Sequence, residues 1–229
     1  MIFRRAFRRV WFAVLVAAAV TLGLGYFYLD YVMPFDLDRP PSFLTKFHLQ
    51  TLKQQPDRCM AALERASVDF RPVLPEQRDN GCGYDDGVRL LKSDIDYGSR
   101  ILLTCPAMLA LLSWERHVLV PKAREYFDRK VRTTGQLGTY ACRKIGGQKG
   151  SRLSQHAYAN AIDISGFTLE GGERISVQRD WNDAGAKGRF LRDLRDGACG
   201  YFGATLSPEF NAAHANHFHF DMGAIRICR

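Results

Sequence analysis

The most informative features of this chain are two histidine-containing stretches, SQHAYANAID at residues 154–163 and HANHFH at residues 214–219. Four of the six histidines lie in these stretches, and Asp163 follows His156 by seven residues. Imidazole nitrogens and carboxylate oxygens are common zinc ligands, and a catalytic zinc site combines three protein ligands with an open position for water. The two stretches therefore predict a split metal site that binds zinc and supports hydrolysis.

The first stretch leads into an expected strand. Residues 161–167 are rich in strand-forming residues and are followed by the Gly171-Gly172 turn. His156 lies at the end of the loop before this strand, so its side chain and that of Asp163 are expected to converge across a turn.

The second stretch leads into another expected strand, because residues 218–222 alternate in polarity. His217 and His219 are two residues apart and share one face of that strand, while Phe218 points to the other. One of these histidines is expected to bind the metal and its neighbour to handle the metal-bound water. His214 lies one turn earlier, within reach of the same space.

The remaining elements predict an α+β domain, in which a small antiparallel sheet carries the zinc site and packs against helices. Expected helices cover residues 49–66, interrupted or started at Pro56, residues 106–127, kinked or restarted at Pro121, and residues 184–196. Further strands are expected at residues 139–145 and 174–177, with a Gly and Lys loop at 146–150 between the first of these and the histidine stretch. The helices then precede most of the strands, which is the order typical of α+β folds.

The N-terminus predicts a membrane anchor. Residues 1–9 contain four arginines, whereas residues 10–29 contain no charged residue and are long enough to cross a bilayer as a helix. Asp30, Asp36 and Asp38 follow this run, so the positive-inside rule places the N-terminus in the cytoplasm and the rest across the membrane. A cleaved signal peptide shares these features. The anchor is favoured because the apolar run is longer than a usual signal core.

The anchor divides the chain into a cytoplasmic basic segment at residues 1–9, a transmembrane anchor at 10–29, a spacer at 30–48 and a domain at 49–229. Beyond the anchor the chain has 28 Lys and Arg against 24 Asp and Glu, a net charge of +4. This mild excess suits an anionic polymer or a membrane surface. No basic run is interleaved with aromatic residues, so nucleic acid is not an expected partner.

The six cysteines agree with export, because all of them lie beyond the anchor and none forms a CxxC pair. Disulfide bonds in an oxidising compartment are expected. Six cysteines allow 15 pairings, and spacing does not choose among them. The candidates are Cys59, Cys82, Cys105, Cys142, Cys199 and Cys228.

The histidine stretches also carry a family resemblance. Ser154, His156, Ala161 and Asp163 match the signature Ser-x-His-x-x-Gly-x-Ala-x-Asp of zinc peptidases that act on bacterial cell walls. These are the D-Ala-D-Ala carboxypeptidases and dipeptidases and the penicillin-insensitive murein endopeptidases, with the hedgehog N-terminal domain as a structural relative. A wider pattern resembles the bacterial extensin-like C-terminal domain family over about residues 36–228. It comprises YACR at 140–143, LSQHA at 153–157, DISGF at 163–167 and HFHFD at 217–221.

The resemblance implies a ligand set for Zn²⁺ of His156, Asp163 and His219. It also implies that His217 is the catalytic base and that His214 is a further active-site histidine, since the spacing His-x-x-His-x-His of the murein endopeptidases is reproduced. Many relatives use a glutamate three residues before the last ligand, where this chain has Asn216. This difference moves the resemblance from the carboxypeptidases toward the endopeptidases.

A second difference is Ala159, where the signature has glycine. Alanine is expected to be tolerated there if the backbone does not need a positive φ.

Three further residues have expected roles around the metal. Arg143 is suited to stabilise a developing oxyanion or to bind a substrate carboxylate. Asp221 is expected to orient His219 or His217, and Ser154 to form a turn or outer hydrogen bond rather than to contact substrate. For all three a purely structural role is the alternative.

Three function classes follow. The first is a zinc hydrolase, held in the bacterial inner membrane, that cuts peptidoglycan peptides in the periplasm as a cross-link endopeptidase or D-Ala carboxypeptidase. The second is a zinc-containing module that binds wall peptides or a protein without cleaving them. The third is a structural envelope protein held by its disulfides. Metal content and the release of peptidoglycan fragments distinguish them.

Overall fold

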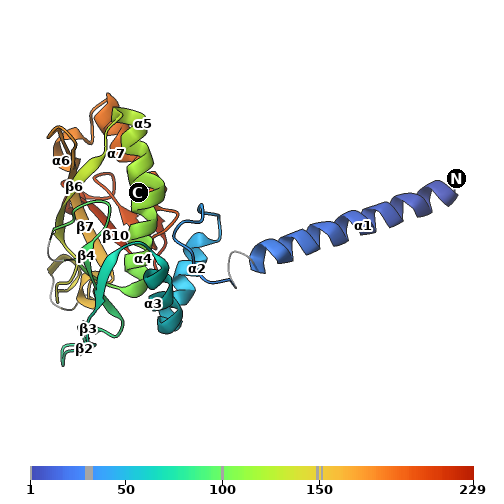
Figure 1. Cartoon of the computed structure of the whole chain (residues 1–229), viewed down its shortest axis with the longest axis horizontal. Helices are drawn as coiled ribbons and strands as arrows, with labels where there is room; N and C mark the ends of the chain where they lie inside the picture. The colour runs from blue at the N-terminus through green and yellow to red at the C-terminus, as the bar shows by residue number, and fades with distance from the viewer. Residues whose placement is uncertain (1, 29–32, 99–100, 148–149, 151) are drawn as a thin grey trace.

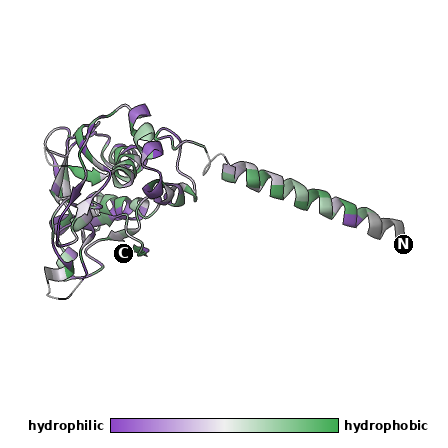
Figure 2. Cartoon of the chain, turned by 90° about the horizontal axis from the view of Figure 1, so that it is seen from below, coloured by the Kyte–Doolittle hydropathy of each residue, from purple (hydrophilic) through white to green (hydrophobic). Residues whose placement is uncertain are grey.

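The basic N-terminal residues and most of the uncharged run after them form one long helix, α1 (Ile2–Phe27), which extends away from the rest of the chain (Figure 1). The computed structural model describes residues 2–28, 33–98, 101–147, 150 and 152–229, so Asp30, the start of the expected spacer and part of the 146–150 loop lie outside the described residues. Residues 7–27 have a mean hydropathy of 2.1, and Figure 2 shows apolar residues along most of α1. This confirms an N-terminal helix long and apolar enough to cross a membrane, a property that a signal sequence shares.

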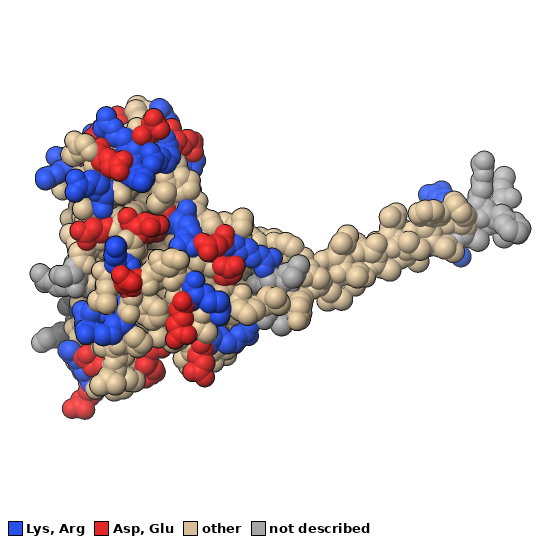
Figure 3. Space-filling view, in the orientation of Figure 1, with Lys and Arg blue, Asp and Glu red and all other residues tan. Residues whose placement is uncertain are grey.

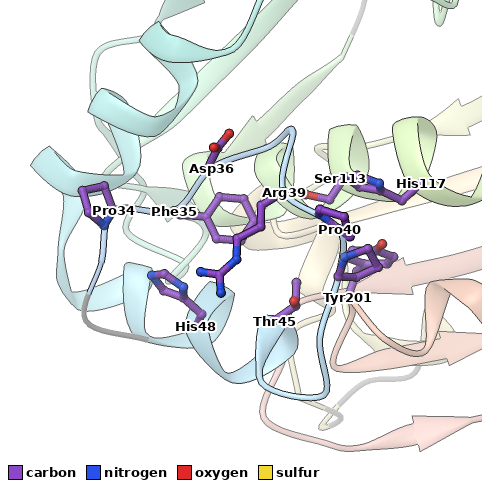
Figure 4. Close-up of a pocket in the computed structure, with 11 residues that line it drawn as sticks. Pro34, Phe35, Asp36, Arg39, Pro40, Thr45, His48, Ser113, His117 and Tyr201 are labelled. Carbon is purple, nitrogen blue, oxygen red and sulfur yellow. The ribbon is translucent and has the colours of Figure 1, made fainter. Parts of the chain in front are cut away.

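The segment after α1 packs on the domain. Phe35 and Leu37 belong to the main core, and the Leu37 carbonyl accepts a hydrogen bond from His117 Nε2 at 2.8 Å. Asp38 also pairs with Arg116. Figure 4 shows the small pocket that this segment covers, whose volume of about 20 Å³ has room for one water molecule rather than a substrate. Residues 33–41 are therefore a packed strap, and we call them the strap below.

The first helices of the domain differ slightly from expectation. The helix expected at residues 49–66 is divided into α2 (Thr45–Thr51), a 3-10 turn (Leu52–Gln54) and α3 (Pro56–Arg65). The break lies at Gln55, because the residue before a proline is disfavoured in helical conformation and proline is favoured at the first position of a helix.

The strand expected at residues 161–167 is the centre of the largest sheet. β7 (Ala161–Leu169) pairs antiparallel with β10 (Phe218–Asp221) and with β6 (Val131–Gly138). The six-stranded sheet has the order β11-β9-β10-β7-β6, and β8 (Arg174–Ser176) also pairs with β7. β9 is Ala204–Leu206, and β11 is Ile227–Cys228 and lies parallel to it.

A bulge in β7 changes which residues of the strand face the core. Gln136 pairs with Ile164 and Gly135 with Gly166, so Ser165 is an extra residue on β7. Before the bulge Ile164 faces the core, and after it Phe167 does so. Asp163 thus points to the face opposite the core. Gly166 has no side chain because a Cβ there would lie 2.3 Å from the carbonyl oxygen of Ile175 on β8.

A long apolar helix covers the core face of this sheet. It consists of α4 (Cys105–Trp114), a π-helical segment (Glu115–Leu119) and α5 (Val120–Phe127). The Trp114 ring lies 5.3 Å from Phe220 and 6.3 Å from Phe167. The helix continues past Pro121, and the π-helical segment ends two residues before this proline, which has no backbone N–H to donate. The helix expected at 184–196 is α7 (Ala186–Ala198), which packs on α5 through Phe190, and α6 (Val177–Asp180) precedes it.

Other parts of the expected secondary structure are wrong. Residues 139–145 do not form a strand but follow the end of β6, and the strand β9 was not expected from the sequence. Strands also precede the long helix. These are β1 (Asp69–Pro72), β4 (Gly87–Lys92) and β5 (Leu102–Thr104) in one sheet, and β2 (Glu76–Gln77) and β3 (Gly83–Tyr84) in another. The fold is mixed helix and sheet, which agrees with α+β.

All six cysteines form disulfides, as expected. Cys59–Cys105 joins α3 to α4, Cys82–Cys142 joins the β2–β3 hairpin to the segment after β6, and Cys199–Cys228 joins the end of α7 to β11. Basic and acidic side chains are interspersed over the face of the domain shown in Figure 3.

A buried carboxyl group in the π-helical segment predicts how stability depends on pH. Glu115 is 4% exposed, and Ser93 Oγ donates a hydrogen bond to it at 3.0 Å. Burial raises the pKa of Glu115 to about 7, despite the neighbouring hydroxyls of Tyr97 and Ser93, which favour the charged form. The folded chain therefore keeps this proton after the unfolded chain, with an ordinary pKa of about 4.3, has lost it.

We expect this group to reduce the free energy of unfolding as the pH rises from about 4.5 to about 7, by about 3 kcal/mol in total. Denaturant unfolding of wild type and Glu115→Gln at about pH 5 and about pH 8 measures this, since glutamine does not titrate. Equal pH dependence in the two proteins would show that Glu115 is ionised throughout.

Candidate metal centre

Pairing of β7 with β10 brings Asp163 and His219 together. The two residues are directly opposite each other in the antiparallel register, so their side chains lie on the same face of the sheet. His219 Nδ1 lies 2.9 Å from Asp163 Oδ1. On the other side of Asp163 the register partner is Gly138 of β6, whose lack of a side chain leaves that side of the carboxylate open.

His156 reaches the same carboxylate from a 3-10 turn, Gln155–Tyr158, that immediately precedes β7. The Ser154 side chain accepts a hydrogen bond from the backbone N–H of His156 and so caps this turn. His156 Nε2 lies 3.1 Å from Asp163 Oδ1 and 3.2 Å from His219 Nδ1. The three potential ligand atoms all lie within 4.8 Å of one another, and the three residues are buried.

The outer hydrogen bonds of the two histidines determine which ring nitrogen faces the cluster as an acceptor. His156 Nδ1 lies 3.0 Å from the Thr139 carbonyl oxygen, which can only accept, so His156 donates there and Nε2 carries a lone pair. His219 Nε2 likewise donates to Asp221 Oδ2 at 2.9 Å, which leaves Nδ1 as the other free position. Two imidazole lone pairs and a carboxylate therefore converge on one point, an arrangement that fits a divalent cation of the zinc type.

The electrostatics of the cluster favour positive charge at this point. Burial raises the pKa of Asp163, but the adjacent imidazoles of His156 and His219 outweigh it and hold that pKa below its ordinary value. Burial lowers the pKa of His219, but the carboxylates of Asp163 and Asp221 outweigh it and raise that pKa to about 9. The proton that His219 binds thus occupies the position that a metal ion would take.

His217 and His214 lie beside the cluster and form a second layer. His217 Nε2 is 3.7 Å from Asp163 Oδ1, and its Nδ1 lies 2.7 Å from Asn216 Oδ1. The His214 ring lies 5.2 Å from that of His217 and 5.8 Å from that of His219. Burial and the neighbouring His219 lower the pKa of both His217 and His214, that of His214 to about 4. Both rings are therefore neutral at neutral pH.

An open pocket lies over this cluster and has a volume of about 400 Å³. Its lining includes His156, Asp163 and His217 from the cluster, Leu137 and Gly138 from β6, and Ala141, Arg143 and Asn216. The Arg143 side chain is 58% exposed and lies 3.4 Å from Asp163 Oδ2. Its guanidinium group is thus accessible to a ligand while remaining at the edge of the cluster.

The structure brings together all of the residues expected in the site, and it adds three details. Ser154 contacts the backbone of His156 and not its ring. The Thr139 carbonyl was not foreseen, because a backbone acceptor leaves no signature in the sequence. Asn216, noted only as the residue in place of a glutamate, is the hydrogen-bond partner of the His217 ring.

The conformation of Ala159 differs from the expectation that this position does not need a positive φ. Its φ is 50°, so this position does adopt the left-handed conformation that glycine favours. The conformation costs roughly 1–2 kcal/mol for a residue with a Cβ. Ala159 is buried against Tyr84 and Leu102, and this packing offsets part of the cost.

Fold and site together define an α+β domain with a buried cluster of two histidines and an aspartate on one face of its largest sheet. The chain matches the family described as Extensin-like protein C-terminus over residues 57–229, which is most of its length, and it belongs to that family. No curated protein and no solved structure matches the chain significantly.

Proposed function

We propose that the protein is a zinc-dependent peptidase that hydrolyses peptide bonds of peptidoglycan in the bacterial periplasm, where α1 anchors it in the inner membrane. The observation that carries this proposal is the convergence of His156 Nε2, Asp163 Oδ1 and His219 Nδ1 on one point. The disulfides support an oxidising compartment, and the resemblance of the motifs to those of cell-wall peptidases supports the substrate class.

His156, Asp163 and His219 would hold the ion. Bound zinc would supply a Lewis acid that polarises the substrate carbonyl and lowers the pKa of a water molecule. Thr139 and Asp221 keep the two imidazoles in the tautomers and orientations that ligation needs. Because the set provides three ligands, one position is left for water or substrate.

His217 would accept the proton from the water molecule. Its hydrogen bond to Asn216 leaves Nε2 as an acceptor that faces Asp163 across 3.7 Å. The lowered pKa of His217 keeps this nitrogen unprotonated at neutral pH, as a general base requires. Arg143 at the pocket edge is positioned to bind a substrate carboxylate or the oxyanion of the transition state.

Elemental analysis combined with a peptidoglycan digest tests the proposal. The full chain, purified in detergent without chelators, is compared with His219→Ala and with His117→Gln as a control histidine outside the cluster. We expect one zinc per chain and release of peptide fragments, read by mass spectrometry, for wild type and the control. His219→Ala should lose both.

Zinc without fragments would contradict hydrolysis and favour a binding module. Absence of zinc from wild type, both as purified and after incubation with the ion, would contradict the metal centre itself. Thermal unfolding of each variant shows whether the loss reflects the site or the fold.

A further inference from the structure

An exposed apolar patch lies on the side of the domain that α1 approaches. Phe43 is 76% exposed, Phe47 is 40% exposed and Ile225 is 51% exposed. Phe43 lies two residues before α2, and Phe47 lies within it, four residues further along the chain. We call Phe43 and Phe47 the aromatic patch.

The sequence of α2 is unusual for a helix on a water-exposed surface, which normally has one apolar and one polar face. Thr45, His48 and Leu49 form the buried face and contribute to the domain interior. The opposite face presents the exposed Phe47 ring, and the still more exposed Phe43 ring lies just before the helix. A second nonpolar environment outside the domain would account for this pattern.

A charged group near the patch indicates the kind of nonpolar environment that would cover it. The Arg226 guanidinium lies 4.7 Å above the Phe47 ring, which adds a positive charge to the aromatic patch. Lys46 does not serve this purpose, since its ammonium group points to the backbone oxygens of Cys199 and Gly203. Aromatic rings combined with arginine suit the headgroup region of a bilayer that contains anionic lipid.

Contact with α1 places the patch at the boundary of the membrane. Tyr26, in the last turn of the span-length helix, stacks on Phe43 with ring centroids 5.5 Å apart and an interplanar angle of 12°. From this continuity between helix end and patch we propose that the aromatic patch docks the domain onto the lipid surface of the membrane that α1 spans. The inference rests on the proposed anchor and is independent of hydrolase activity.

Docking would determine where the metal centre faces. The packed strap replaces a free tether, and Figure 1 shows α2 and α3 on the side of the domain toward α1, with β6 and β7 on the opposite side. β7 carries Asp163, and the pocket is lined from β6. A docked domain would therefore hold the pocket away from the bilayer.

Cleavage of the reconstituted chain tests the docking. A protease site is introduced between Tyr28 and Met33 of the full chain, which is inserted into vesicles of phosphatidylethanolamine and phosphatidylglycerol. The vesicles are floated before and after cleavage. We expect the released domain to stay with the vesicles in wild type, and its partition coefficient to fall at least about tenfold in Phe43→Ser/Phe47→Ser. Leu74→Ser/Leu91→Ser, which alters exposed leucines elsewhere, should behave as wild type.

Each other outcome contradicts the inference at an identifiable step. Failure of the uncleaved chain to float would overturn the anchor and the docking with it. Flotation of the uncleaved chain with full release of the wild-type domain would overturn docking alone, as would equal retention of the Phe43→Ser/Phe47→Ser domain. A released domain that elutes as a dimer would assign the patch to a second copy of the chain. Intact disulfides and an unchanged melting temperature confirm that the variants fold.

Discussion

Replacement of His217 by glutamine is expected to leave one zinc bound per chain and to slow peptide hydrolysis by about 10²–10⁴-fold. The two effects separate because His217 lies beside the ligand atoms without belonging to them. Its Nε2 is 3.7 Å from Asp163 Oδ1, whereas His156 and His219 approach that oxygen to 3.1 Å and 2.9 Å. Glutamine keeps the polarity of the side chain but cannot accept a proton at neutral pH.

The measurement is the rate of fragment release from purified peptidoglycan at saturating zinc, with metal content determined on the same samples. His214→Gln is the matched control, because this ring lies in the same layer without contacting Asp163. We expect a smaller loss of rate in that variant. An unchanged rate in His217→Gln would show that another group accepts the proton, and loss of zinc would make His217 a ligand.

The three residues at the centre of the site could be predicted from the sequence because their placement depends on short spacings and on strand alternation. The spacing of His156 and Asp163 and the alternation around His219 place all three side chains correctly once the strands at 161–167 and 218–222 are recognised. Direct opposition of Asp163 and His219 is a matter of register between distant strands. The requirement that two halves of a metal site meet left His217 and His219 as alternative ligands, and the family resemblance selected His219.

The errors have physical causes. β6 has the sequence VRTTGQLG, whose polar residues and two glycines hide an edge strand, whereas TYACRKI at 139–145 has the alternation of a strand. That segment is held in its irregular path by Cys142, which is bonded to Cys82, and by the hydrogen bond from Ala141 N to the His156 carbonyl. Neither the disulfide pairing nor such a long-range backbone contact can be read from spacing.

Removal of the Cys82–Cys142 disulfide is expected to have a large effect on both the stability of the fold and the metal centre. Cys82–Cys142 closes a loop of 60 residues, so its loss is expected to lower the free energy of unfolding by about 4 kcal/mol. It also supports the wall of the pocket, because the β2–β3 hairpin holds the segment on both sides of Ala141. Tyr140 donates a hydrogen bond to Glu76 at 3.0 Å, and Asn80 contacts the sulfur of Cys142 at 3.1 Å.

Cys82→Ser/Cys142→Ser is therefore expected to weaken zinc binding and hydrolysis by about 10–100-fold at temperatures where the variant is still folded, since the Thr139 carbonyl that orients His156 lies in the released segment. Cys199→Ser/Cys228→Ser is the matched control. It removes the disulfide that closes a loop of 29 residues at the other edge of the sheet and should lower the free energy of unfolding by about 3.6 kcal/mol. Its zinc affinity should be unchanged, because neither cysteine adjoins the pocket.

Zinc titration and denaturant unfolding of both double variants separate the two effects. Equal zinc affinity in the two variants would mean that the hairpin stabilises the fold without shaping the site. A selective loss in Cys82→Ser/Cys142→Ser would show that the tautomer of His156 depends on a bond formed only in an oxidising compartment. Assembly of the metal centre would then follow export of the domain, because in a reducing cytoplasm the segment that carries Thr139 would not be held against His156.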